Sequence, residues 1–309
     1  MKKFLLNIGL FTLVLSCFYG VIFIVTPTGS WGADYVRVSS PQYSSLILGS
    51  SMAARGLSPS VVQQVLENYY EFPMMNFSFN IGIPYGEVYF NRIAEKLKDN
   101  KNKNSLFLIS VDPYTIADYQ TNEINNNFKR EKNVFLAQLR SVTSQPNWEY
   151  FLKHILLSKK FVTKQKISCD KYGFDSSLLN METDTEQNVR ERIETIVLPW
   201  YEKDVIPNYR FSEERLSYLS KIVNLLKENG DVFLIRMPFE AELLKITDSI
   251  SPNFDKDMQD FANVHNVNYI SFWGNTSKYR TTDGVHLYKE EAERFTKDIC
   301  DSIKVLKNR

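Results

Sequence analysis

Short apolar runs that alternate with stretches of helical spacing constrain the fold of this 309-residue chain most strongly, and they begin at Ser44. Five runs are rich in aliphatic and aromatic residues and typical of buried strands: residues 45–49, 74–80, 106–111, 232–237 and 267–272. Helical spacing is found in residues 61–70, 87–97 and 241–246, and a last helix is expected over residues 288–306. The sequence therefore predicts an α/β fold, doubly wound and flavodoxin-like, around a parallel sheet of about five strands.

The alternation stops between Asp112 and about Tyr209. This segment is rich in Asn, Lys, Gln and aromatic residues, with helix-like spacing near residues 133–140, 148–157 and 186–197. We expect a helical insertion, about 113–210, that lies over the carboxyl edge of the sheet, where ligand sites of open α/β sheets are found. The alternative is that the insertion only fills space.

An uncharged run from Phe4 to Val25 follows Lys2 and Lys3. At about 1.5 Å per residue it is roughly 33 Å long as a helix, close to the ~30 Å hydrocarbon core of a bilayer. A cleaved signal peptide has a shorter apolar region and a small-x-small site, and residues 26–31 show no clear one. We predict that residues 1–27 form an uncleaved signal anchor and residues 28–309 one extracytoplasmic domain. The two lysines place the N-terminus in the cytoplasm, so this single-pass protein of the inner, cytoplasmic membrane would have a periplasmic or extracellular domain.

The cysteines allow two other interpretations. Residues 14–17, Val-Leu-Ser-Cys, resemble a degenerate lipoprotein box with Cys17 acylated, but the apolar run continues beyond Cys17, where a mature lipoprotein turns polar. A small apolar residue in a spanning helix is the favoured interpretation. Cys169 and Cys300 are the only others, too few for a disulfide framework or a Cys-based zinc site, although they could pair in an oxidising compartment.

Charge and motif content exclude several classes of function. The chain has 37 Lys+Arg and 36 Asp+Glu, a formal charge of +1, so no basic field indicates a nucleic-acid partner. Gly-rich nucleotide loops are absent from the sequence. His154 and His265 lie in helix-like stretches, where a packed or surface histidine is the common case, and they have no metal-ligand spacing. We predict no metal, no cofactor and no nucleic-acid partner.

His286 stands in a different context, the polar turn Asp283-Gly-Val-His286 directly before the last predicted helix. A carboxylate three residues away can bind one imidazole nitrogen and leave the other free as a general base. The alternative is a helix-capping aspartate beside a surface histidine. A matching nucleophile is Ser51 in Gly49-Ser50-Ser51, at a tight turn from the first predicted strand into a helix, where helix-end amides help to hold an oxyanion.

These residues resemble the SGNH/GDSL hydrolase superfamily. Gly49-Ser50-Ser51 stands where the superfamily has Gly-Asp-Ser, which makes Ser51 the nucleophile, and the turn from Asp283 to His286 matches its Asp-x-x-His block. The superfamily has a second conserved block, whose glycine donates its amide to the oxyanion hole. This glycine corresponds to Gly86, with Gly82 as a competing choice. The resemblance covers about residues 43–114 and 231–309, and it implies an oxyanion hole that includes the backbone amides of Ser51 and Gly86.

The third block departs from this pattern. The superfamily's Gly-x-Asn appears as Ser110-Val-Asp112, so a carboxylate replaces an amide donor. An ionised Asp112 would repel an oxyanion, where one donor is typically worth about 3 kcal/mol. Asp112 is then turned away or protonated, or catalysis is weak. A similar departure is found in a membrane-anchored subgroup of SGNH-like proteins, which resemble the alginate O-acetylation and teichoic-acid D-alanylation accessory proteins. Residues 234–238 of this chain look like the segment that ends a strand in that subgroup. Arg55 and Arg236 fit either an anionic substrate or salt bridges.

The resemblance implies a membrane-anchored, serine-dependent acyltransferase or esterase for O-acetyl groups of a cell-envelope polysaccharide. Ser51 would attack the acyl carbonyl, His286 would carry the proton and Asp283 would orient His286. A multipass membrane acyl-transfer protein is the implied partner. The alternative is a catalytically silent SGNH-like scaffold or binding protein in a polysaccharide modification or export complex; Asp112 favours this reading, and the intact Ser51, Asp283 and His286 oppose it.

Overall fold

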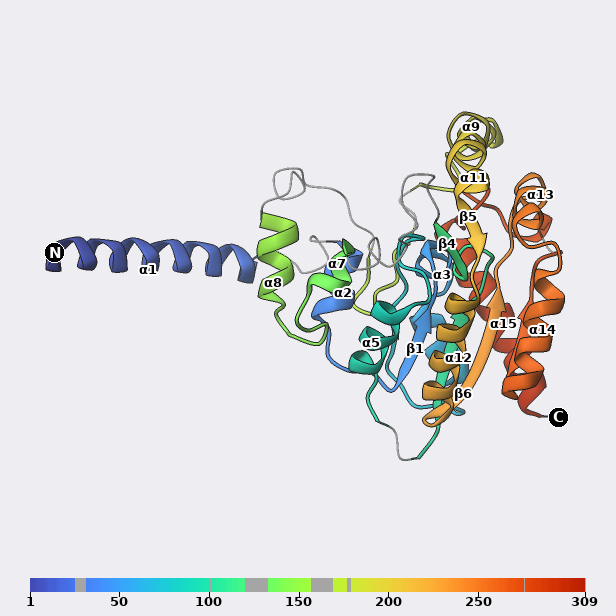
Figure 1. Ribbon diagram of the computed structural model, residues 1–309, viewed down its shortest axis with the longest axis horizontal. Helices are drawn as coiled ribbons and strands as arrows, with labels where there is room; N and C mark the ends of the chain where they lie inside the picture. Colours follow the sequence, from blue (N-terminus) through green and yellow to red (C-terminus); the bar gives the residue numbers. More distant parts are fainter. Residues whose placement is uncertain are drawn as a thin grey trace.

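The computed structural model describes residues 1–25, 32–99, 102–119, 133–156, 169–176, 179–274 and 276–308. Its centre is a parallel five-stranded sheet with the strand order β2-β1-β3-β6-β7 (Figure 1). The strands are β1 (Ser45–Leu48), β2 (Met74–Asn76), β3 (Ser105–Ser110), β6 (Gly230–Arg236) and β7 (Asn268–Ser271). The order reverses between β1 and β3, as in doubly wound sheets. The predicted α/β fold with five parallel strands is confirmed.

Both faces of the sheet are covered, and successive residues of β3 show how. Phe107 and Ile109 belong to one apolar core, and Leu106 and Leu108 belong to the other, as the two-residue period of a strand requires. The first core is built with α5 (Glu87–Lys96), α12 (Glu213–Lys227) and α14 (Phe254–His265). The second is built with α3 (Ser51–Gly56), α4 (Pro59–Leu66) and α15 (Lys289–Lys307), and α13 (Ala241–Ile250) adds Leu243 to it.

The insertion differs in part from the predicted helical segment. An antiparallel pair, β4 (Ala117–Tyr119) with β5 (Tyr209–Phe211), joins its two ends. Between them lie α7 (Phe135–Gln138), α8 (Trp148–Tyr150) with a π-helical extension Phe151–Leu156, and α9 (Glu186–Arg192). The sequence did not predict this strand pair, because three-residue strands about 90 positions apart leave no local pattern.

The helix that starts with α9 continues as far as α11 (Ile206–Asn208) through α10 (Leu198–Trp200) and two π-helical turns, Ile193–Val197 and Tyr201–Val205. Pro199 and Pro207 follow these turns. Proline has no amide hydrogen, so the regular ladder of hydrogen bonds is interrupted there and wider turns result. Two further helices, α2 (Ala33–Ser39) and α12, lie where no helix is predicted from the sequence, whereas α14 ends at His265, in the helix-like stretch noted there.

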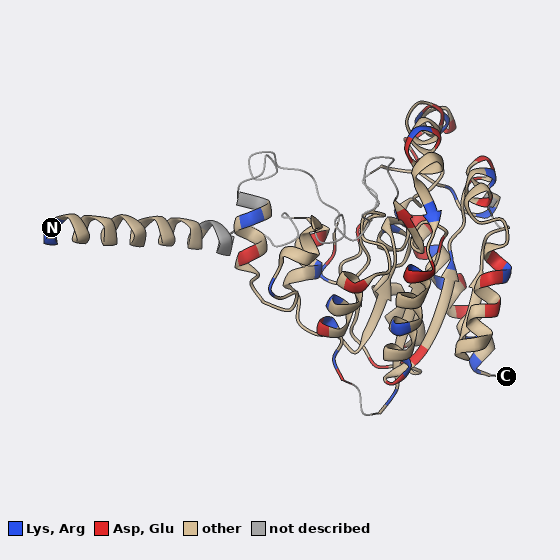
Figure 2. Ribbon diagram, viewed as in Figure 1, with Lys and Arg blue, Asp and Glu red and all other residues tan. Residues whose placement is uncertain are grey.

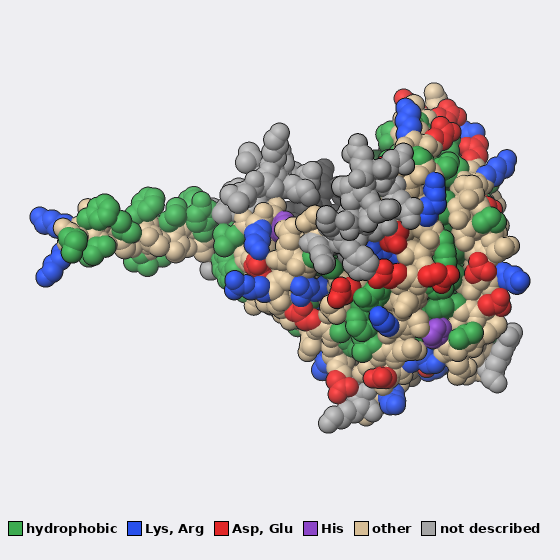
Figure 3. Space-filling view, in the orientation of Figure 1, with side chains coloured by type: hydrophobic (Ala, Val, Ile, Leu, Met, Phe, Trp, Pro, Cys, Tyr) green, Lys and Arg blue, Asp and Glu red, His purple; other side chains and the backbone are tan. Residues whose placement is uncertain are grey.

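The N-terminal helix α1 (Lys2–Val25) projects away from the sheet and its helices (Figure 1). Its 24 residues span roughly 36 Å at about 1.5 Å per residue. Apolar side chains lie along it, whereas charged side chains are scattered over the rest of the surface (Figures 2 and 3). Among the described residues, α1 alone is long and apolar enough to cross a membrane, and such a helix is either a membrane anchor or a signal sequence. The predicted boundary after residue 27 lies outside the described residues.

The three cysteines are free. Cys17 is exposed on α1, and Cys300 is buried in the packed face of α15. Cys169 donates a hydrogen bond from Sγ to the carbonyl of Asp170 at 3.3 Å. A disulfide between Cys169 and Cys300 is therefore not formed.

Candidate active site

Ser51 is the first residue of α3, three positions after Leu48, the last residue of β1. Gly49 has φ +148°, and a Cβ there would lie 2.7 Å from Cβ of Ser110 and 3.0 Å from Cβ of Ala53. Any other residue would collide with β3 or α3, so glycine is required where the chain turns directly from strand into helix. This turn places Ser51 at the carboxyl edge of β1, next to the point where the strand order reverses.

His286 is held in a closed turn between β7 and α15. The amide of Thr282 donates to the carbonyl of His286 at 2.7 Å, and Gly284 has a positive φ of +84°. Asp283 Oδ1 accepts the backbone amides of Val285 at 3.1 Å and His286 at 2.8 Å. Since one carboxylate oxygen fixes the turn, the other is free to bind the imidazole ring.

A chain of hydrogen bonds joins the three predicted catalytic residues. Asp283 Oδ2 lies 2.8 Å from Nδ1 of His286, and Nε2 of His286 lies 2.9 Å from Oγ of Ser51. Burial alone would raise the pKa of Asp283, but its bonds with His286 lower that pKa to about 2. An ionised Asp283 accepts the Nδ1 hydrogen, which leaves Nε2 as the acceptor for the Ser51 hydroxyl. The arrangement prepares the serine oxygen for nucleophilic attack.

A cavity of about 140 Å³ opens onto these residues. It is lined by Ser50, Ser51, Met52, Ile81, Asp112, Tyr114, Val197, Trp200, Tyr201, Phe239, Asp283, Val285 and His286. Val197, Trp200 and Tyr201 come from the insertion, which therefore forms one wall of the cavity and does more than fill space. This volume is below the roughly 300–1,000 Å³ of pockets that hold drug-sized ligands, so the cavity suits a small group such as a short acyl chain.

Asp112 also lines the cavity, two residues after the end of β3, and is 3% exposed. Its Oδ1 accepts the amides of Tyr114 and Thr115, both at 2.9 Å, and its Oδ2 accepts the hydroxyl of Ser50 at 3.2 Å. Burial raises the pKa of Asp112 to about 6, against the opposing effect of these hydrogen bonds. Both oxygens are directed at neighbouring donors, so Asp112 is turned toward its own loop and Ser50.

Comparisons with known proteins add little to this geometry. No protein-family model matches the chain, and no curated protein matches it. Among solved structures, it is similar to a protein from Agrobacterium tumefaciens str. C58 described as a "putative arylesterase", with a TM-score of 0.36 and 8% sequence identity. The alignment covers 84% of this chain and 98% of that chain. A TM-score this low carries no argument, so the site must be judged on its own geometry.

Neither of the two candidate glycines for the oxyanion hole is among the described residues that line the cavity beside Ser51. Gly86 stands at the start of α5 and is absent from the described residues that line the cavity. The amide of Gly82 donates to Oδ1 of Asn80 at 2.8 Å, which closes a turn and directs Ile81 toward the cavity. The structure thus brings Ser51, Asp112, Asp283 and His286 together without either glycine, and the role of Gly86 stays a prediction.

The other candidate residues have structural partners. Arg55 forms an ion pair with Asp175 at 3.6 Å, and Arg236 is buried in an ion pair with Asp255 and lies over the ring of Trp273. A salt bridge therefore accounts for Arg55, whereas Nε and Nη2 of Arg236 are buried without a hydrogen-bond partner among the described residues. The described part of the chain contains no group of three or more His, Cys, Asp or Glu residues that could hold a metal ion.

Several cavity residues were not predicted from the sequence, and Tyr114 is the most informative. It is 3% exposed, and its hydroxyl has no hydrogen-bond partner among the described residues. Tyr201, Trp200 and Val197 reach the cavity only because the insertion folds back over the sheet. The position of Tyr114, two residues after Asp112, was the one local signal that could have identified it.

Proposed function

We propose that this chain is a serine-dependent enzyme of acyl-ester chemistry, an acyltransferase or esterase that acts on O-acetyl groups of a cell-envelope polysaccharide. The observation that carries the proposal is the hydrogen-bonded series Ser51–His286–Asp283, with contacts of 2.9 and 2.8 Å, at the opening of a cavity. Nucleophile, base and orienting carboxylate in this order are the requirements of acyl transfer through a covalent intermediate. The acetyl group and the polysaccharide follow from the family resemblance, and the small cavity supports a short acyl group.

The residues would act in two half-reactions. Oγ of Ser51 forms a bond to the acyl carbon while Nε2 of His286 takes its proton and then gives it to the leaving alcohol. Asp283, whose pKa of about 2 keeps it ionised, stabilises the imidazolium. Water or a sugar hydroxyl then attacks the acyl-serine with His286 as base. The first intrahelical bond of α3 joins the amide of Ala54 to the carbonyl of Ser50, so the amide of Ser51 is available for an oxyanion.

The proposal places this chemistry outside the cytoplasmic membrane. In this interpretation α1 is a signal anchor with its N-terminus in the cytoplasm, supported by its length and by Lys2 and Lys3 at its start. The domain would then reach periplasmic or surface polysaccharides, and a multipass membrane protein would supply acyl groups. These partners follow from the resemblance together with the anchor.

The test begins with the purified full chain in detergent. Ser51→Ala is expected to lose both covalent labelling by a fluorophosphonate probe and hydrolysis of p-nitrophenyl acetate. Ser217→Ala, which changes an exposed serine on α12, is the matched control and is expected to keep both. Equal labelling and turnover in Ser51→Ala would refute the serine mechanism, and an unlabelled, inactive wild-type protein would favour the scaffold alternative.

The second step compares O-acetyl content of host surface polysaccharides between wild type and Ser51→Ala at matched protein levels. A fall in the variant indicates a transferase, and a rise indicates an esterase. No change in a strain whose protein is active in detergent would refute the polysaccharide substrate and leave the serine chemistry in place.

A further inference from the structure

The ring of Tyr114 is fixed by packing alone. It lies edge-on to Tyr201, with ring centroids 5.6 Å apart, and edge-on to Tyr209, with centroids 6.1 Å apart. Its hydroxyl is buried, and no group in the described parts of the chain meets it in hydrogen-bond geometry. A phenylalanine would pack in the same way without an unpaired polar atom, which is costly in an apolar setting. The hydroxyl therefore needs an explanation other than folding.

The cavity offers that explanation, because Tyr114 lines it together with Ser51 and His286. Burial, with a smaller contribution from Tyr201, raises the pKa of Tyr114, so the hydroxyl keeps its hydrogen across the physiological range. The Tyr201 side chain interacts with this hydroxyl, but no described group accepts from it in hydrogen-bond geometry, so the protonated hydroxyl can still donate to a ligand beside the nucleophile. Charge that develops on a substrate oxygen would supply the acceptor, and such donors act most strongly in apolar surroundings.

The neighbouring side chains cannot supply this hydrogen bond. Asp112 accepts three hydrogen bonds with its two oxygens, and Ser50 donates its hydroxyl to Asp112. The position that holds an amide donor in the resembling superfamily is therefore closed to an oxyanion. Tyr114 follows Asp112 by two residues, and the amide of Tyr114 is itself bonded to Asp112, so the same loop presents the phenol.

We propose that the Tyr114 hydroxyl donates a hydrogen bond to the acyl oxygen of the substrate and takes the place of the missing side-chain amide. This inference rests on the proposed serine chemistry. When Oγ of Ser51 bonds to the acyl carbon, the carbonyl electron pair moves to oxygen, and Tyr114 holds that oxyanion without giving up its proton. The electron pair returns when the leaving alcohol departs with the proton from His286. Tyr114 thus contacts the reacting group and is a catalytic residue.

The test is Tyr114→Phe in the full chain, with p-nitrophenyl acetate as substrate. Loss of one oxyanion donor typically lowers kcat by about 10²–10³-fold, with KM little changed. Inhibition by a trifluoromethyl ketone, which forms an oxyanion adduct on the serine, is expected to weaken by a similar factor. The midpoint of thermal unfolding should stay the same or rise, because the deleted hydroxyl has no partner. A kcat within about threefold of wild type would overturn the proposal.

Two further variants make the result specific. Tyr279→Phe removes a buried hydroxyl that donates to Asp298 and is not among the described residues that line the cavity, and it should lower the unfolding midpoint while kcat is kept. Tyr201→Phe changes the adjacent phenol, and a large loss there with none in Tyr114→Phe would assign the donor to Tyr201. If Ser51→Ala keeps turnover, the proposed function itself fails; if only Tyr114→Phe keeps it, the Tyr114 assignment fails alone.

Discussion

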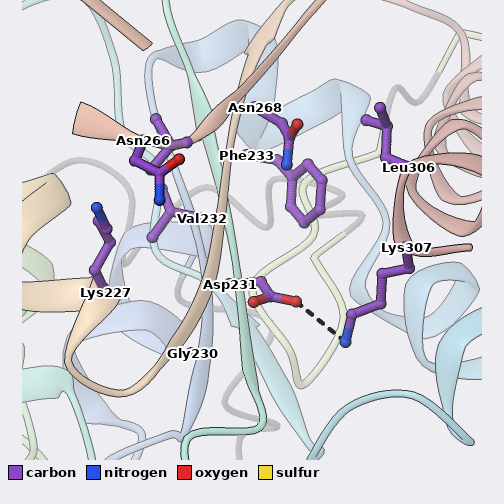
Figure 4. Close-up of a pocket in the computed structure, with 10 residues that line it drawn as sticks. Lys227, Gly230, Asp231, Val232, Phe233, Asn266, Asn268, Leu306 and Lys307 are labelled. Carbon is purple, nitrogen blue, oxygen red and sulfur yellow. Dashed lines mark ion pairs between the residues drawn. The ribbon is translucent and has the colours of Figure 1, made fainter. Parts of the chain in front are cut away.

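The two edges of the parallel sheet each carry a hollow, and the larger one lies at the amino edge. That hollow measures about 310 Å³, against about 140 Å³ at the carboxyl edge. Asp231 in this hollow faces Lys307 at 3.1 Å (Figure 4). Asp231 also accepts the hydroxyl of Tyr70 at 2.8 Å, and Lys227 donates to the carbonyl of His265. At the carboxyl edge, Ser51 and His286 are bonded for reaction and the Tyr114 hydroxyl is left unpaired. The candidate active site is distinguished by its reactive and unpaired polar groups, and not by the volume of its hollow.

The direction of the chain explains this difference. At the amino edge helices end, and the C-terminal turns of α12, α14 and α15 carry basic residues that complement the negative end of a helix. At the carboxyl edge helices begin, so free amides and turn loops such as Gly49-Ser50 face the same space. The polar groups of the amino edge therefore stabilise the fold, whereas the carboxyl edge offers hydrogen-bond donors to a ligand.

The largest expected difference between the edges concerns their histidines. His286→Gln removes the base and should lower turnover of p-nitrophenyl acetate by about 10⁴-fold or more. His265→Gln, at the end of α14, changes a ring whose Nδ1 lies 3.3 Å from Oδ1 of Asn224 and should leave turnover within about twofold. Similar losses in both variants would contradict the assignment of chemistry to the carboxyl edge.

The aspartates give the next largest contrast. Asp283→Asn should lower kcat by about 10⁴-fold, because the wrong imidazole tautomer is favoured. The folded-state pKa of about 2 lies below the ordinary 3.8, so the ionised carboxylate stabilises the fold above pH 3.8, and this contribution is lost as the pH falls through 2. The full shift corresponds to about 2 kcal/mol, of which about half is lost between pH 7 and pH 3, and this loss is measured from the unfolding free energies of wild type and variant at the two pH values. Asp231→Asn at the amino edge is the control, and its turnover should match wild type.

Asp112 should show the opposite dependence of stability on pH. Its folded-state pKa of about 6 lies above 3.8, so the native state holds its proton longer and stability falls as the pH rises from about 4 to 6. Asp112→Asn keeps an oxygen for the amides of Tyr114 and Thr115 and carries no charge. The gain in unfolding free energy of this variant over wild type should grow by about 2 kcal/mol between pH 4 and pH 7. A gain that is the same at both pH values would show that burial does not perturb Asp112.

The sequence predicted those parts of the molecule whose signals are local. β1, β3 and β6 are buried on both faces and therefore appear as continuous apolar runs. Ser51 and His286 stand beside Gly49 and Gly284, whose positive φ angles mark the turns. The buried positions Leu219, Ile222, Val223 and Leu226 of α12 also follow helical spacing, and that signal was present although no helix was predicted there.

The cavity could not be predicted in full because its wall depends on long-range packing. Tyr201 meets Tyr114 only after the insertion folds back and β5 pairs with β4. The partners of Asp112 likewise depend on the approach of β1 to β3, which brings Ser50 to its carboxylate. Sequence spacing identified the candidate catalytic groups, whereas the environment that sets their protonation and their donors exists only in the folded chain.

The smallest expected effect is at the amino edge, and it gives the most direct test of the comparison. Lys307→Met breaks the ion pair with Asp231, whose side chains are 34% and 46% exposed. A pair with this exposure is worth less than about 1 kcal/mol and is weakened further by salt. Tyr70 still donates to Asp231, so the local fold should persist, and turnover should equal that of wild type at every substrate concentration. A change in KM of more than about threefold would show that the larger hollow takes part in substrate binding, and the two edges would then no longer divide stability from chemistry.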